Sequence, residues 1–481
     1  MSIEGKKLVY VPKEYQPLIY NKIIETKRNI ASVDPGLGKT VSTLWASQSK
    51  LLNGEVRGVL IIAPVRVTRM VWPKEVKKWD FSAGEEVCNL RDIVISAKTK
   101  EQQHKKLIAI AQYLSGDCHY FTINYENVPK LCEYIKATRG PMPFDYIVFD
   151  EITKAQKHDN AYMKPLRKII KAFPHRTGLT GTLLEAGYMG LFGQVRLIDG
   201  GEALDHRITY YRNKYFDKGE YCEYVYHLKE GAGPTIMQAI DHLTVTVKDA
   251  DWLDKVKPEF IDIPVTLPAK ARPHYKELEK ELITLIERGP NKEDDTVIAE
   301  SRLVLCNKLR QVATGQVYDE DRKVVNIHTA KLEALGELLK KIKEPVLIAT
   351  SFKHEVASIL KAFPALEEFK ESRMEAWKAG KVRGWVANAG SISHGIDGIQ
   401  YGSRIVIWYS PTYSFGATKQ FNDRIIGGLR ALVLKKTPII YRLVMSDTIE
   451  EAVIEVVATR QSDSAAFADV MKNLESFRSV A

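Results

Sequence analysis

The sequence lacks long hydrophobic runs and paired cysteines, and both absences limit what the protein can be. The 481 residues include no apolar run of the ~18 residues that a membrane-crossing helix needs. The five cysteines, at positions 88, 118, 132, 222 and 306, are odd in number and include no CxxC pair. This pattern argues against a disulfide scaffold or a structural zinc site and is typical of a reducing cytoplasm. The N-terminal residues also lack the apolar core of a signal peptide, so we expect a cytoplasmic protein with no membrane partner.

The amino-acid composition excludes further classes of protein and favours an anionic partner. Hydrophobic residues make up 45% and charged residues 27% of the chain, which excludes a mainly disordered chain, a collagen-like fibre and a bare coiled coil. Lys plus Arg number 70 and Asp plus Glu number 60, so the net charge is 70 − 60 = +10. This excess of positive charge indicates a polyanionic partner, nucleic acid first, although plain solubility would also explain it.

Alternating strand and helix patterns predict two α/β lobes. At roughly 100–200 residues per domain, the length predicts two to four domains. Short apolar runs predict strands at 59–63, 93–96, 120–124, 146–149 and 177–180, and again at 345–350, 382–387, 403–408 and 439–443. Helical patterns separate them, for example at 74–79 and 100–114, and this alternation predicts parallel sheets covered on both faces.

The predicted fold class is therefore α/β, with two tandem parallel-sheet lobes joined by a mainly helical connector. The N-terminal lobe is placed at 1–204, the connector at 205–325, the C-terminal lobe at 326–460 and a helical tail at 461–481. Two long helices, at 269–288 and 296–314, are predicted within the connector.

The most specific local signal is the stretch DPGLGKT at 34–40. A phosphate-binding loop needs glycines that let backbone N–H groups wrap the phosphates, a lysine for the outer phosphates and a hydroxyl for magnesium. Gly36, Gly38, Lys39 and Thr40 supply these groups, although Val33 stands where the strict pattern has glycine. An apolar segment precedes the loop and a helical pattern follows it, which favours nucleotide binding over an ordinary glycine-rich turn.

A second signal is the apolar strand at 145–149, which runs directly into Asp150 and Glu151. In a magnesium-nucleotide site, one carboxylate orients the metal and the next polarises the attacking water. Acids often end strands at a protein surface, so the pair is weak evidence alone. Together with the phosphate loop, it predicts a site for nucleotide hydrolysis.

These motifs and others in the same order resemble the superfamily 2 helicases and translocases, nearest to the Swi/Snf-type branch and its compact phage-encoded members. DPGLGKT is similar to this branch's motif I, in which the first glycine is commonly absent. LIIAP at 60–64, FTINYE at 121–126, DEIT at 150–153 and LTGT at 179–182 resemble motifs Ia, Ib, II and III. VLIATSFKHE at 346–355, AGSISHGIDGIQ at 389–400 and QFNDR at 420–424 resemble motifs IV, V and the start of VI.

The resemblance implies RecA-like lobes, with ATP and Mg²⁺ as cofactors, and assigns roles to individual residues. The implied catalytic residues are Lys39, Asp150, Glu151 and Arg424, and the implied magnesium ligands are Thr40 and Asp150. The implied nucleotide-binding residues are Tyr15, Gln16, Asp34, Pro35, Gly36, Leu37, Gly38, Lys39, Thr40, Asp397, Gln420 and Arg424.

The resemblance also implies contacts with a nucleic-acid backbone. The expected residues are Arg66, Thr122, Asn124, Tyr125, Ser351, Lys353, Ser393 and His394. Hydroxyl, amide and cationic groups of this kind contact phosphates without reading bases. His394 is not expected to bind a metal, because no second ligand stands at helical spacing beside it.

Motif VI departs from the family pattern, because its usual second arginine is replaced by Gly427. Such arginines stabilise charge on the transferring phosphoryl group. Arg424 remains, whereas Arg430 follows the flexible pair Gly427 and Gly428, so its direction is not predictable.

The sequence thus favours an ATP-dependent DNA translocase or helicase, directed by DNA structure (duplex, fork or branch) rather than by base sequence. The alternatives are an RNA helicase, or a nucleic-acid clamp whose ATPase is weakened by Gly427. The intact Lys39, Asp150 and Glu151 argue against the clamp. A monomer is plausible, and the resemblance implies the cytoplasm of a bacterial or phage-infected host cell.

The segment 209–227 interleaves aromatic with basic residues and has two interpretations. Such a pattern suits stacking on bases combined with attraction to phosphates. The simpler interpretation, which we favour slightly, is a protrusion whose tyrosines pack on the first lobe.

Overall fold

The protein forms two compact units. The computed structural model describes residues 7–91, 118–138, 144–156, 161–185, 187–219, 222–252, 257–287, 295–319, 321, 323–392, 396, 398–426 and 437–459. The first unit comprises Met1–Asp217 and Leu228–Trp252, and the second comprises Lys218–His227 and Leu253–Ala481.

The first unit is built on a seven-stranded sheet in which every described pair of neighbours is parallel. Its strands, in spatial order, are β3 (Val87–Asn89), β4 (Tyr120–Asn124), β2 (Val59–Ala63), β5 (Tyr146–Asp150), β6 (His175–Thr180), β1 (Arg28–Val33) and β9 (Thr244–Val247). The strands predicted at 59–63, 120–124, 146–149 and 177–180 are confirmed within a residue or two. The strand predicted at 93–96 and the helix predicted at 100–114 lie outside the described residues.

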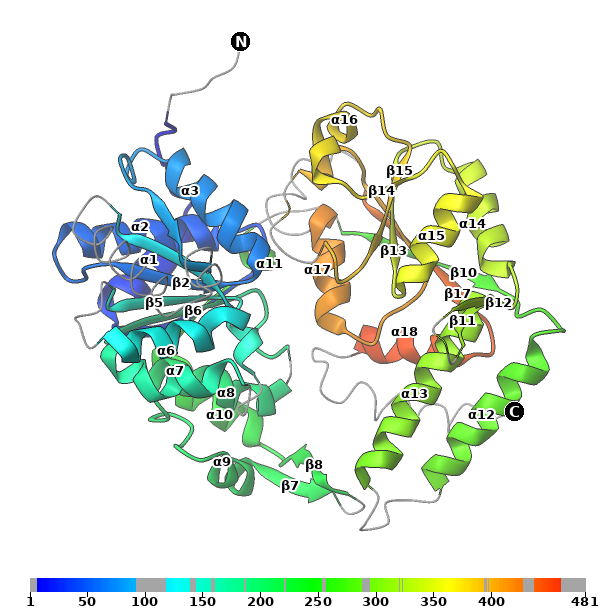
Figure 1. Ribbon diagram of the computed structural model, residues 1–481, viewed down its shortest axis with the longest axis horizontal. Helices are drawn as coiled ribbons and strands as arrows, with labels where there is room; N and C mark the ends of the chain where they lie inside the picture. The colour runs from blue at the N-terminus through cyan, green and yellow to red at the C-terminus, as the bar shows by residue number, and fades with distance from the viewer. Residues whose placement is uncertain are drawn as a thin grey trace. The chain divides into compact units, whose positions relative to one another are not determined.

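Helices cover both faces of this sheet, as expected for parallel strands joined by crossovers. The first face carries α1 (Gln16–Glu25), α2 (Lys39–Leu52) and α3 (Trp72–Lys78), and the second carries α6 (Val128–Thr138), α7 (Met163–Ile169) and α8 (Gly187–Asp199) (Figure 1). The helix predicted at 74–79 is α3.

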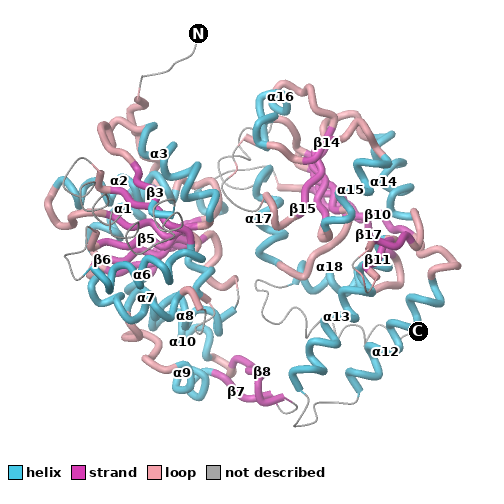
Figure 2. Tube along the Cα trace, in the orientation of Figure 1, coloured by secondary structure: helices cyan, strands magenta, loops and turns pink. Residues whose placement is uncertain are grey.

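A small extension follows these layers in the chain. It comprises α9 (Ile208–Tyr215) and α10 (Ala232–Ile240) of the first unit and, between them in the chain, a two-stranded sheet of β7 (Phe216–Gly219) and β8 (Cys222–Leu228) (Figure 2). Most of this small sheet, Lys218–His227, belongs to the second unit. The chain then returns through β9 and ends the unit in α11 (Asp249–Trp252).

The second unit holds a six-stranded sheet, which is also parallel throughout. Its strands, in spatial order, are β10 (Glu259–Val265), β17 (Ile439–Met445), β16 (Ile405–Trp408), β13 (Val346–Thr350), β15 (Gly384–Asn388) and β14 (Glu367–Glu368). The four strands predicted in this lobe are β13, β15, β16 and β17.

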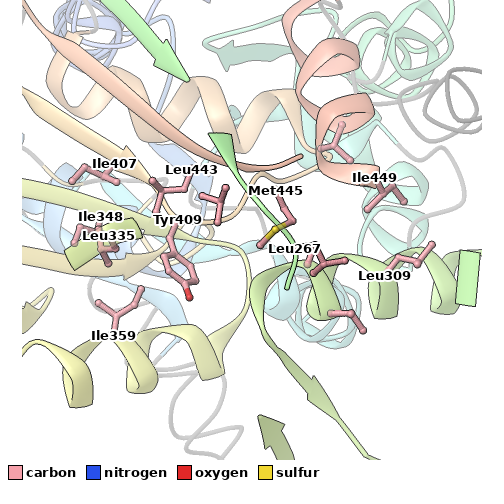
Figure 3. Close-up of a cluster of buried hydrophobic side chains, with 14 of the residues drawn as sticks. Leu267, Leu309, Leu335, Ile348, Ile359, Ile407, Tyr409, Leu443, Met445 and Ile449 are labelled. Carbon is pink, nitrogen blue, oxygen red and sulfur yellow. The ribbon is translucent and has the colours of Figure 1, made fainter. Parts of the chain in front are cut away.

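The core of the second unit lies on both faces of its sheet, because successive side chains of a strand point to opposite faces. Val346 and Ile348 of β13 join one buried cluster, shown in part in Figure 3, whereas Leu347 and Ala349 join another. The first cluster packs under α12 (Arg272–Glu287), α13 (Asp295–Thr314), α14 (Ala330–Lys341), α15 (Lys353–Ala362) and α18 (Ile449–Thr459). The second packs under α16 (Met374–Lys378) and α17 (Phe415–Ile426).

A buried ion pair joins α14 to α18 within this core. The Lys331 ammonium lies 2.6 Å from both carboxylate oxygens of Glu450, and both side chains are 0% exposed. Lys331 also donates to the carbonyls of Tyr409 and Leu443, each at 2.9 Å, and the Glu450 carboxylate accepts from the Met445 N–H at 2.8 Å. Hydrogen bonds therefore compensate for much of the cost of burying the two charges.

The segment 205–325 differs from the separate helical connector that we predicted. The two long helices are present as α12 and α13, but the segment is divided between the units. Its strand β9 extends the first sheet beside β1, and β10 forms an edge of the second beside β17. Both strands are short or half-exposed, so helical patterns around them dominate the local sequence.

Candidate nucleotide site

The predicted phosphate loop connects β1 to α2 at the carboxyl edge of the first sheet. Gly36 and Gly38 adopt φ angles of 86° and 80°, a left-handed region that favours glycine. A Cβ atom at Gly38 would lie 2.3 Å from the Gln16 amide nitrogen, so a larger residue would not fit there. The loop therefore has the close, glycine-dependent backbone that binding a phosphate requires.

Gln16 of α1 packs directly against this loop. It is only 4% exposed, and its Nε2 donates to the carbonyl of Leu37 at 3.3 Å. Its Oε1 accepts from the Tyr10 hydroxyl at 2.9 Å and from the Lys13 N–H at 2.8 Å. Gln16, which we predicted to bind the nucleotide, is thus held beside the phosphate loop by three hydrogen bonds.

The two predicted acids end β5 at the same edge of the sheet. Asp150 is 5% exposed and its Oδ2 accepts from the Trp72 indole N–H at 2.9 Å. The Lys39 ammonium lies 4.0 Å from Oε2 of Glu151. Burial raises the pKa of the Asp150 carboxyl, and the positive charge of Lys39 partly opposes this rise. The structure therefore brings the lysine of the loop and the acidic pair together.

The backbone at Glu151 is strained and is fixed by its neighbours. Glu151 has a φ of 64°, which costs a non-glycine residue on the order of 1–3 kcal/mol and is found preferentially at functional sites. The Tyr125 hydroxyl lies within hydrogen-bond distance of the carbonyls of Asp150 (3.0 Å) and Glu151 (3.1 Å). The Thr153 hydroxyl donates to Oε1 of Glu151 at 2.9 Å, so both acids are held in defined positions.

These residues fit a magnesium nucleotide. Thr40 stands in the first turn of α2, directly after Lys39, and Asp150 is the strand-end carboxylate facing the loop lysine. Among the described residues, no group of three or more His, Cys, Asp or Glu could hold a metal. Magnesium needs no such cage, because one or two protein ligands, waters and substrate phosphates satisfy it.

Motif III lies against the phosphate loop. A Cβ atom at Gly181, one residue after β6, would lie 3.3 Å from Cγ of Pro35. Thr180 and Thr182 on either side form a local turn, in which the Thr182 N–H donates to the Thr180 hydroxyl at 3.0 Å. The strand order explains this contact, because β6 and β1 are neighbours.

Sequence reasoning missed two residues that hold the acidic pair. The role of Trp72 was not predicted, although its WPKE segment follows motif Ia, and Tyr125 was assigned elsewhere. Both contacts join residues far apart in the chain, so only packing reveals them. For Tyr125, the sequence offered one signal, because this residue directly follows the strand predicted at 120–124.

The motif VI residues of the second unit lie on α17. Gln420 is half-buried, and Arg424, one turn later on the same face, is 8% exposed. The Arg424 guanidinium donates to the carbonyl of Ile396 at 2.9 Å. Asp397, Gly427 and Arg430 lie outside the described residues.

Three of the residues predicted to contact nucleic acid in the first unit are buried in this structure. Thr122 is 0% exposed, and Asn124 and Tyr125 are each 3% exposed. Their polar groups bond inside the unit: Thr122 donates to the Thr68 carbonyl, Asn124 to the Glu126 carboxylate, and Tyr125 holds the acidic pair. All three side chains therefore make internal contacts in this structure, and their contact with a nucleic-acid backbone stays a prediction. Arg66 is half-buried beside the short helical turn Val67–Val71.

In the second unit, Ser351 and Lys353 directly follow β13, at the carboxyl edge of the sheet. Lys353 is exposed in the first turn of α15. Ser351 is half-buried, and its hydroxyl donates to the Pro411 carbonyl at 2.7 Å. Ser393 and His394 lie outside the described residues, so their assignment stays a prediction.

Most described aromatic rings at the start of segment 209–227 are buried, as the packing interpretation predicts. Tyr211, Tyr215 and Phe216 are 0%, 5% and 7% exposed, which confirms that these rings pack in the interior. Tyr210 differs, because it is 53% exposed with the Arg207 guanidinium 5.8 Å from its ring centre.

The two parallel-sheet units have the architecture of two RecA-like lobes. A model of the SNF2-related domain matches residues 25–216, the part of the chain that holds the phosphate loop and the acidic pair. Protein p41 of Acyrthosiphon pisum secondary endosymbiont phage 1 is 31% identical over 460 residues, which cover 93% of this chain and 95% of p41. The chain belongs to the SNF2-related family of superfamily 2, as the motifs had indicated.

A solved structure supports the two-lobed fold. The Hef helicase domain of Pyrococcus furiosus is 15% identical and aligns with a TM-score of 0.51, over 93% of this chain and 98% of that domain. A SWI2/SNF2 ATPase core from Sulfolobus solfataricus in complex with dsDNA is 17% identical with a TM-score of 0.41, over 98% and 96% of the two chains. No described helix is long and apolar enough to cross a membrane.

Proposed function

We propose that the protein is an ATP-dependent DNA translocase or helicase that recognises DNA structure rather than base sequence. The observation that carries this proposal is the arrangement of Lys39, Asp150 and Glu151 at one edge of the first sheet, with Lys39 and Glu151 4.0 Å apart. Family membership supports hydrolysis driven by a nucleic acid. The net charge of +10 supports an anionic partner.

The residues of the first unit have separate roles in this proposal. Backbone N–H groups of the loop and the Lys39 ammonium bind the phosphates of ATP. Thr40 and Asp150 hold magnesium, which when bound neutralises charge on the phosphates. Glu151 orients and polarises the attacking water, and its fixed backbone holds its carboxylate in place for this.

Further residues complete the proposed cycle. Arg424 supplies positive charge to the transferring phosphoryl group, and Gln420 and Asp397 contribute to nucleotide binding. Arg66, Ser351 and Lys353, with Ser393 and His394 as predicted, contact the DNA backbone. Thr122, Asn124 and Tyr125, which are buried in this structure, are proposed for the same backbone as well. We further propose that the protein acts in the cytoplasm of a bacterial or phage-infected cell.

ATPase assays test this function directly. We expect turnover to rise with duplex, forked or branched DNA, to rise less with single strands, and to respond little to RNA. Stimulation by RNA alone would favour an RNA helicase, and tight DNA binding without turnover would favour a clamp. Strand-displacement and triplex-displacement assays on the same substrates then separate unwinding from translocation.

Two variants connect that activity to the site. Lys39→Ala should abolish turnover, because Lys39 meets the phosphates. Glu151→Gln should trap bound ATP with its affinity preserved, because Glu151 acts on the attacking water. Normal turnover in Glu151→Gln would contradict the assignment of the acidic pair.

A further inference from the structure

An exposed tryptophan ends the first unit beside the phosphate loop. Strand β9 runs parallel to β1, so both end at the same edge of the sheet. The N–H of Asp34, the first residue of the loop, donates to the carbonyl of Val247 at 3.0 Å. Helix α11 begins only two residues after Val247, and it carries Trp252.

Trp252 packs against the residue that precedes Gln16. The ring centres of Trp252 and Tyr15 lie 5.8 Å apart at an angle of 55°. Tyr15 is 3% exposed, whereas Trp252 is 41% exposed. The Tyr15 hydroxyl is buried and has no hydrogen-bond partner among the described groups. The indole thus keeps exposed surface next to Tyr15, the residue that precedes Gln16.

Gln16 alone has little capacity left to recognise a base. A glutamine side chain offers two acceptor positions and two N–H donors. Both acceptor positions are used by Tyr10 and Lys13, and one donor is used by Leu37. A single N–H remains, which is too little to hold a heterocycle in one orientation. Another group must supply most of the interaction with the base.

We propose that Trp252 is the stacking surface for the base of the bound nucleotide, with Tyr15 fixing the indole and Gln16 donating one hydrogen bond. This inference rests on the proposed function, because it assumes that the loop at 34–38 binds nucleotide phosphates. Stacking is tolerant of base identity, since every base has an aromatic face. The site should therefore discriminate weakly between ATP and GTP.

Stacking energies measured on aromatic side chains set the expected size of the effect. Removal of one such ring weakens binding by roughly 5- to 150-fold per base. Trp252→Ala should raise the dissociation constant of Mg–ATP by this factor, and Trp252→Phe should retain most of the affinity. Neither change should alter the affinity for inorganic tripolyphosphate, which has the phosphates but no base.

Calorimetric titration of the full-length chain with Mg–ATP and with magnesium tripolyphosphate tests the inference. Tyr210→Ala removes a comparably exposed ring from α9 and serves as the matched control, with both affinities unchanged. Quenching of tryptophan fluorescence by Mg–ATP should also fall in Trp252→Phe. Melting temperatures of all variants show whether the fold is retained.

Two results would overturn the stacking role. One is unchanged ATP affinity in Trp252→Ala, and the other is an equal loss for ATP and tripolyphosphate, which would indicate a structural role for the ring. Lys39→Ala separates this from the proposed function, because it should weaken both ligands. If the wild-type protein binds neither ligand, the proposed function itself fails and the inference falls with it.

Discussion

At the scale of single residues, the acidic pair is held by hydrogen bonds from two buried aromatic side chains. Trp72 and Tyr125 are both nearly fully buried, and each uses its single polar group on the acidic pair. Burial raises the pKa of Asp150, and the charge of Lys39 and the indole hydrogen bond both oppose this rise. Partners of this kind orient metal ligands, and losing one typically lowers metal affinity by roughly 10- to 100-fold.

Trp72→Phe tests this role, because it keeps an aromatic ring but removes the N–H that meets Asp150. We expect the magnesium concentration for half-maximal ATPase activity to rise roughly 10- to 100-fold. Trp79→Phe is the matched control, since it removes an indole hydrogen bond to Glu75 in the same unit. Equal magnesium requirements in the two variants would show that the Trp72 bond is unimportant for metal binding.

At the scale of helices and strands, the buried ion pair of Lys331 and Glu450 leads to a prediction about the free energy of unfolding. Lys331→Met should destabilise the protein by about 3–5 kcal/mol, because it leaves the Glu450 carboxylate buried without its cation. Adding Glu450→Leu should recover a large part of that loss, since no unpaired charge then remains. Urea unfolding of the full chain measures both changes.

The control for this pair is the exposed pair of Lys323 and Asp321. Their side chains are each 75% exposed, so Lys323→Met should change the unfolding free energy very little. A double variant at 331 and 450 as unstable as Lys331→Met alone would mean that packing, rather than charge, causes the loss.

Helix α15 carries a buried histidine whose titration should weaken the fold in acid. His354 stacks on Phe352 and meets the Tyr318 ring edge to face, and neither of its ring nitrogens has a hydrogen-bond partner among the described groups. Burial lowers the pKa of His354 below its ordinary value of 6.5. The unfolded chain therefore takes up a proton first as the pH falls through 6.5, so stability decreases there by at most about 1.4 kcal/mol per pH unit.

His354→Phe should remove this part of the acid sensitivity. We expect the unfolding free energy of the variant to change less between pH 7 and 5 than that of the wild type. A residual slope should remain, because burial also lowers the pKa values of His175 and His328. Identical pH profiles for variant and wild type would show that His354 is not the titrating group.

Much of the fold could be predicted from these elements, and the failures have physical causes. Strands buried on both faces read as short apolar runs, so β2, β4, β5 and β13 were predicted nearly to the residue. The strands β9 and β10 were missed because they are half-exposed and lie among stronger helical patterns. The loop and the acids were predicted from local motifs, whereas the contacts of Trp72 and Tyr125 join distant segments and depend on packing.

At the scale of the whole molecule, the excess positive charge predicts how binding to DNA responds to salt. Each phosphate neutralised by the protein releases counterions, so the logarithm of the affinity should fall linearly with the logarithm of salt concentration. Fluorescence anisotropy with two duplexes of equal length and different base sequence measures both this salt dependence and the preference for base sequence. An affinity that is insensitive to salt would count heavily against a motor that follows a phosphate backbone.

Hydrolysis should also be a property of the whole chain, because the loop belongs to the first unit and Arg424 to the second. If Arg424 alone stabilises the transferring phosphoryl group, Arg424→Ala should remove most turnover while ATP binding persists, and Arg430→Ala should do little. Gly427→Arg should then raise turnover, since it restores the second cation of the family pattern. If Arg430 also acts, both alanine variants should be severe and non-additive, because they stabilise the same charge. A wild-type rate in Arg424→Ala would refute both versions and move the assignment to another cation.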